Sequence, residues 1–140
     1  MEPASAPSPL APPPADAVLL VDDEECCLEL LRIVLELAGY RCKTARSAAE
    51  AKACCLQSLP RAVVTDLGMP EVDGGALGLW VKTQFPAIPL VLVTGHDVDD
   101  IEVRRLRSVF ERILPKPIDP DRLLAVLEAF CAVRAPHGVT

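Results

Sequence analysis

The sequence has few aromatic residues and no long hydrophobic run. Of its 140 residues, 51% are hydrophobic but only 4% are aromatic, so the core has to be built from aliphatic side chains. The apolar run Ala17 to Val21 is far shorter than the roughly 20 residues of a membrane-spanning helix. The first residues contain neither Lys nor Arg and no apolar block, which excludes the pattern of a secretory signal. We therefore expect a cytoplasmic domain without a membrane span.

Positive charge is also in short supply. The 20 acidic and 14 basic side chains give a formal net charge of −6, which argues against a domain that binds nucleic acid by itself. A basic cluster does occur, at Arg104, Arg105 and Arg107. We interpret it as a solvated helix face, with a partner or dimer surface as the alternative. No helix-turn-helix or catalytic module follows Phe130, so we expect no direct DNA binding.

The six cysteines lack the C-x-x-C spacing of a zinc or thioredoxin-like site. They form two adjacent pairs and two isolated positions, namely Cys26-Cys27, Cys54-Cys55, Cys42 and Cys131. Five of the six fall in predicted helices or strands, where a reduced cysteine acts as a small hydrophobic residue. We interpret them as structural rather than as redox or metal-binding groups.

Proline separates a tail from the rest of the chain. Residues 1–16 contain six of the 14 prolines and are predicted to form a disordered tail or linker. Residues 17–133 are predicted to form one domain, and residues 134–140 a C-terminal tail.

Within 17–133, short apolar strands alternate with helices. The predicted strands are 17–21, 41–45, 61–65, 90–93 and 112–114. The first helix ends at Gly39 and is expected to bury the apolar positions Cys27, Leu30, Leu31, Val34 and Ala38. Three further helices are expected at 48–57, around 77–84 and at 98–107, and a last one starts at Pro120, with Asp119 as its N-cap and Leu123, Leu127 and Phe130 on one face. Ser47 and Glu50 form a predicted capping box.

Five strand–helix units of this size predict an α/β fold with a doubly wound, flavodoxin-like parallel sheet. The expected strand order is 2-1-3-4-5, with helices on both faces. In such sheets, ligands bind at the carboxyl ends of the strands.

Polar residues stand at four of those strand ends. Asp22 and Asp23 follow the first strand, Asp66 the third, Thr94 ends the fourth, and Lys116 follows the fifth. Three neighbouring carboxylates require a proton or a cation, and oxygen ligands favour Mg²⁺. With an ion bound, Asp66 can act as a nucleophile toward phosphorus.

Each residue alone has a plainer interpretation. An Asp pair before a helix can be a cap, Asp66 a turn residue, Thr94 an ordinary strand exit and Lys116 a surface lysine. Their conjunction at adjacent sheet positions favours a functional site.

The motifs resemble those of response-regulator receiver domains over about residues 17–133. They are Val18 to Glu24, Val64 to Pro70 with Asp73-Gly74, Val93 to His96, and Lys116-Pro117. The resemblance implies a phosphoacceptor domain that takes a phosphoryl group from a histidine kinase or phosphotransfer protein and signals to a downstream protein. It implies no turnover of a metabolite, so the chain is not expected to be an enzyme, and it leaves homodimerisation on phosphorylation as an option.

The resemblance also implies residue roles. Asp66 would be the phosphoacceptor. Asp23 would bind Mg²⁺ directly and Asp22 largely through water, with Asp66 and the backbone carbonyl of Gly68 completing the protein ligands. Thr94 would hydrogen-bond the phosphoryl group, and Lys116 would form an ion pair with it. The Lys116-Pro117 peptide bond would be cis.

The sequence departs from the pattern of the family in two features. Receivers usually carry Tyr or Phe three residues before the lysine, where this chain has Ile113, and a small Gly-Ala-like stretch is replaced by Val109-Phe110. His96 and Gly68 occupy positions that tune the loss of the phosphoryl group in the family.

Other functions remain open at this stage. A receiver-like scaffold without phosphorylation is compatible with Ile113, and a phosphorelay module of a hybrid kinase is compatible with the tail. A haloacid-dehalogenase phosphatase would need an acid where Gly68 stands, and a flavodoxin would need a phosphate loop where Asp22 to Glu25 stand. The initial Met favours a complete single-domain regulator.

Overall fold

The computed structural model describes residues 17–69, 73–95 and 100–134. The predicted tail 1–16 and residues 135–140 of the predicted C-terminal tail lie outside the described residues. Among the residues described, no helix is both long and apolar enough to cross a bilayer.

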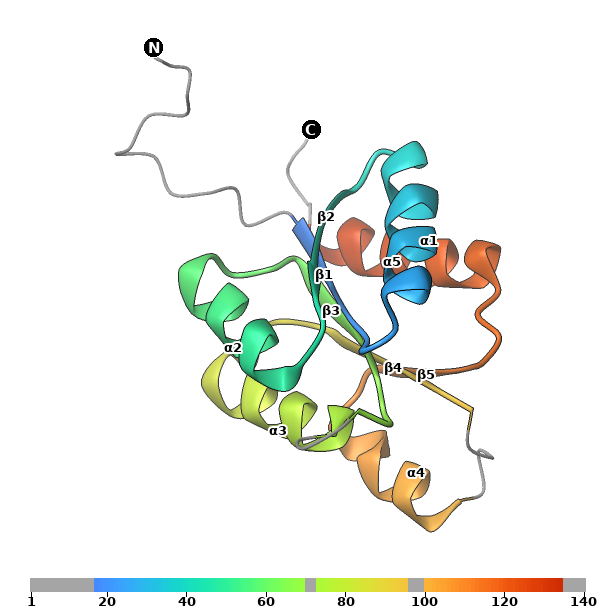
Figure 1. Ribbon diagram of the computed structural model, residues 1–140. Coiled ribbons are helices and arrows are strands. Elements are labelled where there is room, and N and C mark those ends of the chain that lie inside the picture. Colours follow the sequence, from blue (N-terminus) through green and yellow to red (C-terminus); the bar gives the residue numbers. More distant parts are fainter. Residues whose placement is uncertain (1–16, 70–72, 96–99, 135–140) are drawn as a thin grey trace.

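A five-stranded parallel sheet forms the centre of the fold (Figure 1). Its strands are β1 (Ala17–Val21), β2 (Arg41–Ala45), β3 (Ala62–Asp66), β4 (Leu90–Thr94) and β5 (Arg112–Pro115). The order β2-β1-β3-β4-β5 confirms the predicted topology. The register aligns the strand ends: Val21 pairs with Ala45 and Thr65, and Thr94 with Pro115. The carboxyl ends of all five strands therefore form one edge.

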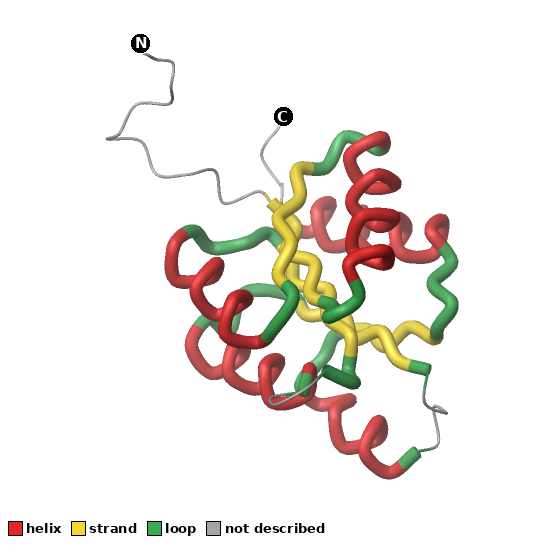
Figure 2. Tube along the Cα trace, in the orientation of Figure 1, coloured by secondary structure: helices red, strands yellow, loops and turns green. Residues whose placement is uncertain are grey.

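Helices cover both faces of the sheet (Figure 2). They are α1 (Glu25–Leu37), α2 (Ala48–Gln57), α3 (Gly74–Gln84), α4 (Ile101–Arg105), a 3-10 turn η1 (Leu106–Ser108) and α5 (Pro120–Arg134). Alternate strand residues enter two separate cores. Val18 and Leu20 face the core under α1 and α5, while Leu19 and Val21 face the core under α2, α3 and α4. Burial on both faces explains why the inner strands are continuous apolar runs.

The predicted buried face of α1 was mostly wrong. The buried residues are Leu28, Leu31 and Leu35, whereas Leu30 is 62% exposed. The helix carries two sets of apolar residues that both recur at helical spacing and are offset by about one residue. Periodicity alone therefore does not show which set is buried. The sheet selects one face and leaves the other at the surface.

The helix predicted at 98–107 is shorter in the structure. The α-helix covers Ile101–Arg105, and η1 continues it as a tighter turn. Residues 98 and 99 lie outside the described part of the chain. The basic residues Arg104, Arg105 and Arg107 are all exposed, as expected for a solvated face.

The predicted capping box at Ser47 and Glu50 is confirmed in part by the observed hydrogen bonds. Ser47 accepts a hydrogen bond from the backbone N–H of Glu50 (3.1 Å). The Glu50 carboxylate accepts one from Arg46 N (2.8 Å), one residue before the position that the capping box predicts. On α5, Leu123 and Leu127 are buried and Phe130 packs against the same core.

The five described cysteines are free thiols. Their predicted core role holds fully only for Cys55, which is buried. Cys27, Cys42 and Cys54 are partly buried, and Cys26 is exposed. The side chain of Cys131 lies outside the described part of the structure.

Candidate functional site

The polar residues predicted to meet do lie at one edge of the sheet. Asp22 follows β1, Asp66 is the last residue of β3, Thr94 is the last of β4, and Lys116 follows β5. Backbone hydrogen bonds hold the ends in register, since Leu67 N donates to Val93 O (3.2 Å) and Lys116 N to Thr94 O (2.9 Å). Short apolar strands that end at the same level thus bring four distant parts of the sequence together.

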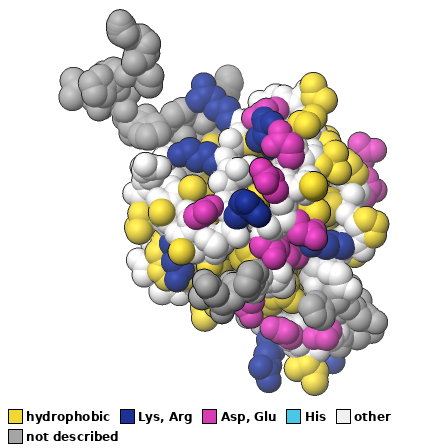
Figure 3. Space-filling model, viewed as in Figure 1, with side chains coloured by type: hydrophobic (Ala, Val, Ile, Leu, Met, Phe, Trp, Pro, Cys, Tyr) yellow, Lys and Arg dark blue, Asp and Glu magenta, His cyan; other side chains and the backbone are white. Residues whose placement is uncertain are grey.

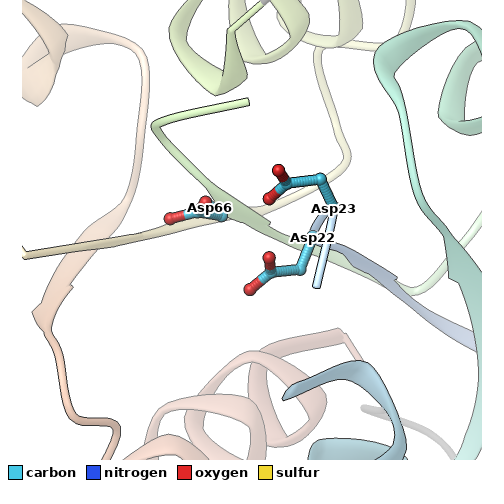
Figure 4. Close-up of side chains that lie close together, drawn as sticks. All are labelled: Asp22, Asp23 and Asp66. Carbon is cyan, nitrogen blue, oxygen red and sulfur yellow. The ribbon is translucent and has the colours of Figure 1, made fainter. Parts of the chain in front are cut away.

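Three carboxylates converge at this edge (Figure 4). Asp22, Asp23 and Asp66 each offer an oxygen, and these oxygens all lie within 4.8 Å of one another. Asp22 and Asp66 are buried, while Asp23 is half-buried. The side chains point to the same side of the chain and come from the neighbouring strands β1 and β3. Such a group of like charges is unfavourable unless a cation joins it.

Lys116 provides one such cation. Its Nζ lies 2.9 Å from Oδ1 of Asp66 and 3.7 Å from Oδ2 of Asp22. The lysine precedes Pro117, and the peptide bond between them is cis, as expected. Three carboxylates and one ammonium group leave two negative charges at the edge of the sheet.

The ionisation of this cluster reflects burial and charge together. Burial raises the pKa of Asp22 above its ordinary value, and the nearby charge of Asp66 adds to this, against a hydrogen bond from Glu24 and the charge of Lys116. Partial burial works to lower the pKa of Lys116, but the hydrogen bond and negative charge of Asp66, with the charge of Asp22, outweigh it and raise that pKa. Lys116 is therefore held as a cation.

The interpretation of the Asp pair as a helix cap does not fit the hydrogen bonds. Asp22 Oδ1 accepts from the backbone N–H of Glu24 (3.0 Å), two residues on. Glu24 itself is the N-cap of α1 and makes no side-chain capping bond. Asp22 is thus held by a local turn that leaves its other oxygen, Oδ2, facing Lys116.

The backbone of Asp66 is held by two residues that the sequence did not single out as site residues. The hydroxyl of Thr65 donates to the Asp66 carbonyl (3.0 Å). Gly74, the first residue of α3, donates its N–H to Leu67 O (2.9 Å) and packs so closely that a Cβ there would overlap the Asp66 carbonyl. The Asp73-Gly74 pair was visible as a turn signal, but its contact with Asp66 was not.

Thr94 and Gly68 lie at this edge in different surroundings. Thr94 is buried at the end of β4, next to β3 and β5 in the sheet. Gly68 is exposed, two residues after Asp66, and a Cβ added there would meet no atom within 4 Å. The Gly68 carbonyl stays a predicted metal ligand, and His96 lies outside the described residues.

The donor set fits a hard divalent cation. All ligand atoms of the cluster are carboxylate oxygens, which Mg²⁺ prefers over softer ligands. The two uncompensated negative charges match the charge of such an ion. Asp22, Asp23 and Asp66 are the residues that could hold it.

An apolar groove of about 200 Å³ runs beside the cluster. Asp22 and Lys116 line one part of it, and the remaining lining comes from α1, the loop before α5 and the first residue of α5, through Cys27, Leu30, Leu31, Val34, Pro117, Ile118 and Pro120. The Cys27 thiol donates to Glu24 Oε1 (3.1 Å). That bond, with some burial, raises the pKa of Cys27 to about 11, so the thiol stays protonated and is a poor nucleophile.

The apolar surface continues from the groove along α1. Leu30, Ile33 and Leu37 lie on one exposed side of the helix, with exposed fractions of 62%, 44% and 84%. In Figure 3 hydrophobic side chains are visible at the surface in the region of α1, at the upper right. The groove and this stripe form one apolar surface that ends at the acidic cluster.

The chain matches a known protein family. The sequence model described as "Response regulator receiver domain" matches residues 18–128.

Individual proteins agree with this match. An uncharacterised 14.6 kDa protein in the sodA1 3′ region of Leptolyngbya boryana is 33% identical over 124 residues, covering 86% of this chain and 94% of that protein. The C4-dicarboxylate transport transcriptional regulatory protein DctD of Pseudomonas aeruginosa is 34% identical over 128 residues, covering 91% of this chain but only 28% of that regulator. The chain therefore spans about a quarter of the length of that relative.

The fold matches solved structures as well. The receiver domain of NtrX from Brucella abortus superposes with a TM-score of 0.75 at 32% identity, over 82% of this chain and 98% of that domain.

Proposed function

The chain belongs to the response regulator receiver domain family, and on that premise we propose that it accepts a phosphoryl group on Asp66 and signals through protein contacts. The observation that carries the proposal is the position of Asp66. Its carboxylate is buried at the sheet edge, 2.9 Å from Lys116 Nζ, and shares a cluster with two more carboxylates. A carboxylate held this way has a cation on one side and a divalent-ion site on the other.

The reaction is a transfer between two protein groups. An oxygen of Asp66 attacks the phosphorus of a phosphohistidine, the P–N bond breaks, and the imidazole leaves with the electron pair and takes up a proton. Asp66 then carries an acyl phosphate. The domain assists its own phosphorylation and later hydrolysis and converts no metabolite.

The residues around Asp66 have distinct tasks in this transfer. Lys116 neutralises charge on the phosphoryl oxygens and holds Asp66 in place, and the Thr94 hydroxyl hydrogen-bonds the phosphoryl group. Asp22 and Asp23, with Asp66 and the Gly68 carbonyl, would hold Mg²⁺. The bound ion would supply further positive charge to the phosphoryl oxygens.

The apolar surface on α1 supports a docking site for the phosphate donor. A donor histidine has to reach bonding distance of Asp66, and the groove leads from Leu30 to Asp22 and Lys116, which both contact the site. The occupant we propose is an amphipathic helix of the kinase or phosphotransfer protein that presents the histidine. Its apolar face would cover Leu30, Ile33 and Leu37.

Intact-mass spectrometry tests the phosphorylation. Wild type and Asp66→Asn are incubated with a small acyl-phosphate donor, with and without Mg²⁺. We expect wild type to gain one phosphoryl group only with Mg²⁺, and Asp66→Asn to gain none. A gain in Asp66→Asn would show that another residue is the nucleophile. A folded, Mg²⁺-binding wild type that gains nothing, even from a phosphohistidine donor, would favour a scaffold that is not phosphorylated.

A further inference from the structure

Phe110 packs directly on the backbone of α3 at Gly78. Phe110 is buried, and a Cβ at Gly78 would overlap its ring, with Cε1 at 2.8 Å. The aromatic ring thus fills the space that a side chain at position 78 would otherwise occupy. This pair explains how the chain tolerates a bulky residue in the stretch Val109-Phe110.

Two more contacts attach the segment around Phe110 to the same helix. The methyl groups of Leu106 lie against Gly75, where an added Cβ would meet them at 3.2 Å. Glu111 pairs with Lys82 of α3 (2.8 Å) and also accepts a hydrogen bond from Leu90 N at the start of β4 (2.7 Å). Gly75, Gly78 and Lys82 are three and four residues apart, so they lie along one side of α3.

The N-terminal residue of α3 contacts the proposed phosphoacceptor. Gly74 packs against the Asp66 carbonyl and donates to Leu67 O. One rigid helix therefore joins the backbone of Asp66 to Phe110, which lies just before β5. Ile113, by contrast, is an aliphatic residue within β5, where it pairs with Leu92.

We propose that this protein transmits phosphorylation of Asp66 through α3 to Phe110, so that the Phe110–Gly78 contact, and not position 113, reports the phosphorylated state to segment 106–113. The inference rests on the proposed function. Phosphorylation adds negative charge and bulk at Asp66, and a shift of the backbone beside it would press on Gly74 and thereby on the start of α3. A ring packed directly on a helix backbone has to move when the helix moves, because closely packed groups switch between discrete arrangements and do not deform gradually.

Hydrogen exchange of the full chain provides the test. Wild type, Phe110→Leu, Phe110→Ala and Ile113→Ala are treated with acyl phosphate and Mg²⁺, and intact mass records phosphorylation in each sample. In wild type and Ile113→Ala we expect phosphorylation to change amide exchange in 106–113 by about five-fold or more, a usual size for coupling between sites. In both Phe110 variants we expect the same mass gain with a change of less than about two-fold, because the link is removed and the site is left intact.

A double variant that restores the lost side-chain volume keeps the test valid if removal of the Phe110 ring destabilises the fold. Phe110→Ala combined with Gly78→Leu places the bulk on α3 and should recover stability without recovering the coupling. The sole tryptophan, Trp80 on α3, gives a second readout, since its fluorescence should respond to phosphorylation in wild type.

The outcomes separate the two proposals. Wild type that gains no mass from acyl phosphate or from a phosphohistidine donor would overturn the proposed function, and this inference with it. A mass gain in wild type with unchanged exchange at 106–113, a change retained in folded Phe110 variants, or a change lost in Ile113→Ala would each overturn the inference alone.

Discussion

Lys116 Nζ lies 2.9 Å from Oδ1 of Asp66, although Asp66 ends β3 and Lys116 follows β5, and these strands are not neighbours in the sheet. The lysine reaches across the end of β4 to do so, and it also comes within 3.7 Å of Asp22. A single ammonium group thereby lies close to two of the three crowded carboxylates. The electrostatics of the free site depend on it.

Replacing this lysine tests that dependence. We expect Lys116→Gln to lower the free energy of unfolding by about 1–3 kcal/mol in the absence of divalent ions, because buried carboxylates lose a charged partner. Added Mg²⁺ should recover part of the loss, since the ion supplies the missing charge. Urea unfolding with EDTA and with Mg²⁺ measures both effects. Lys43→Gln on β2 is the control and should stay within about 0.5 kcal/mol. An equal loss in the control, or no recovery with Mg²⁺, would contradict the prediction.

Asp22 should destabilise the free fold at neutral pH. Its pKa is higher in the folded protein than the ordinary value of 3.8, so the folded state binds the proton more tightly than the unfolded chain does. The destabilisation appears as pH rises above 3.8 and is complete above the folded-state pKa. At pH 7 without divalent ions, the free energy of unfolding of Asp22→Asn should therefore be about 0.5–2 kcal/mol higher than that of wild type.

Measurements at several pH values distinguish destabilisation by ionised Asp22 from a change in stability that does not depend on ionisation. The advantage of Asp22→Asn should shrink as pH is lowered toward 4, because wild type then takes up the proton at Asp22. Urea unfolding at several pH values measures the difference, and Mg²⁺ titration should show weaker binding by the variant. The interpretation fails if the difference does not vary with pH or if the variant is the less stable protein.

Two glycines near Asp66 offer a matched comparison. Gly74→Ala places a methyl group on the Asp66 carbonyl, which only a backbone shift can relieve, whereas Gly68→Ala meets open space. We expect Gly74→Ala to cost about 1–3 kcal/mol of stability and to slow phosphorylation. Gly68→Ala should change stability by less than about 0.5 kcal/mol. Thermal unfolding and intact mass follow the two quantities, and similar behaviour of the two variants would count against a close α3–Asp66 contact.

The α1 surface predicts a defect that depends on the donor. Leu30→Glu puts a charge into the proposed docking surface, so phosphotransfer from a cognate phosphohistidine protein should slow by about ten-fold or more, equivalent to about 1.4 kcal/mol. Phosphorylation by a small acyl phosphate should not change. Leu56→Glu on α2, a leucine of similar exposure (68% against 62%), should leave both reactions unchanged. A slower reaction with the small donor would mean that Leu30 supports the site itself.

Much of the site could be predicted because each residue is placed by its own strand. Asp22, Asp66, Thr94 and Lys116 each stand at the end of a short strand, and parallel strands place those ends together. The strand order followed from size and crossover handedness. Their spacing along the sequence, with the motifs around them, also led to the family.

Helix packing could be predicted less well. The apolar residues of α1 fit two helical faces, and only contact with the sheet shows that Leu28, Leu31 and Leu35 are buried while Leu30 stays exposed. The helix predicted at 98–107 ends as an α-helix at Arg105, and the next residue, Leu106, packs against Gly75. Local periodicity carries no information on which face a neighbour will cover.

The sequence by itself determined the parallel α/β fold and the acidic edge, because strand patterning and the residue after each strand are local properties. Only the tertiary structure decided how Phe110 is accommodated and how Asp66 is held. Gly78 lies 32 residues before Phe110, so their contact leaves no trace in local spacing, and the contact of Gly74 with the Asp66 carbonyl leaves none either. Contacts of this kind depend on the volumes and charges that the folded chain brings together, and they exist only once the core is packed.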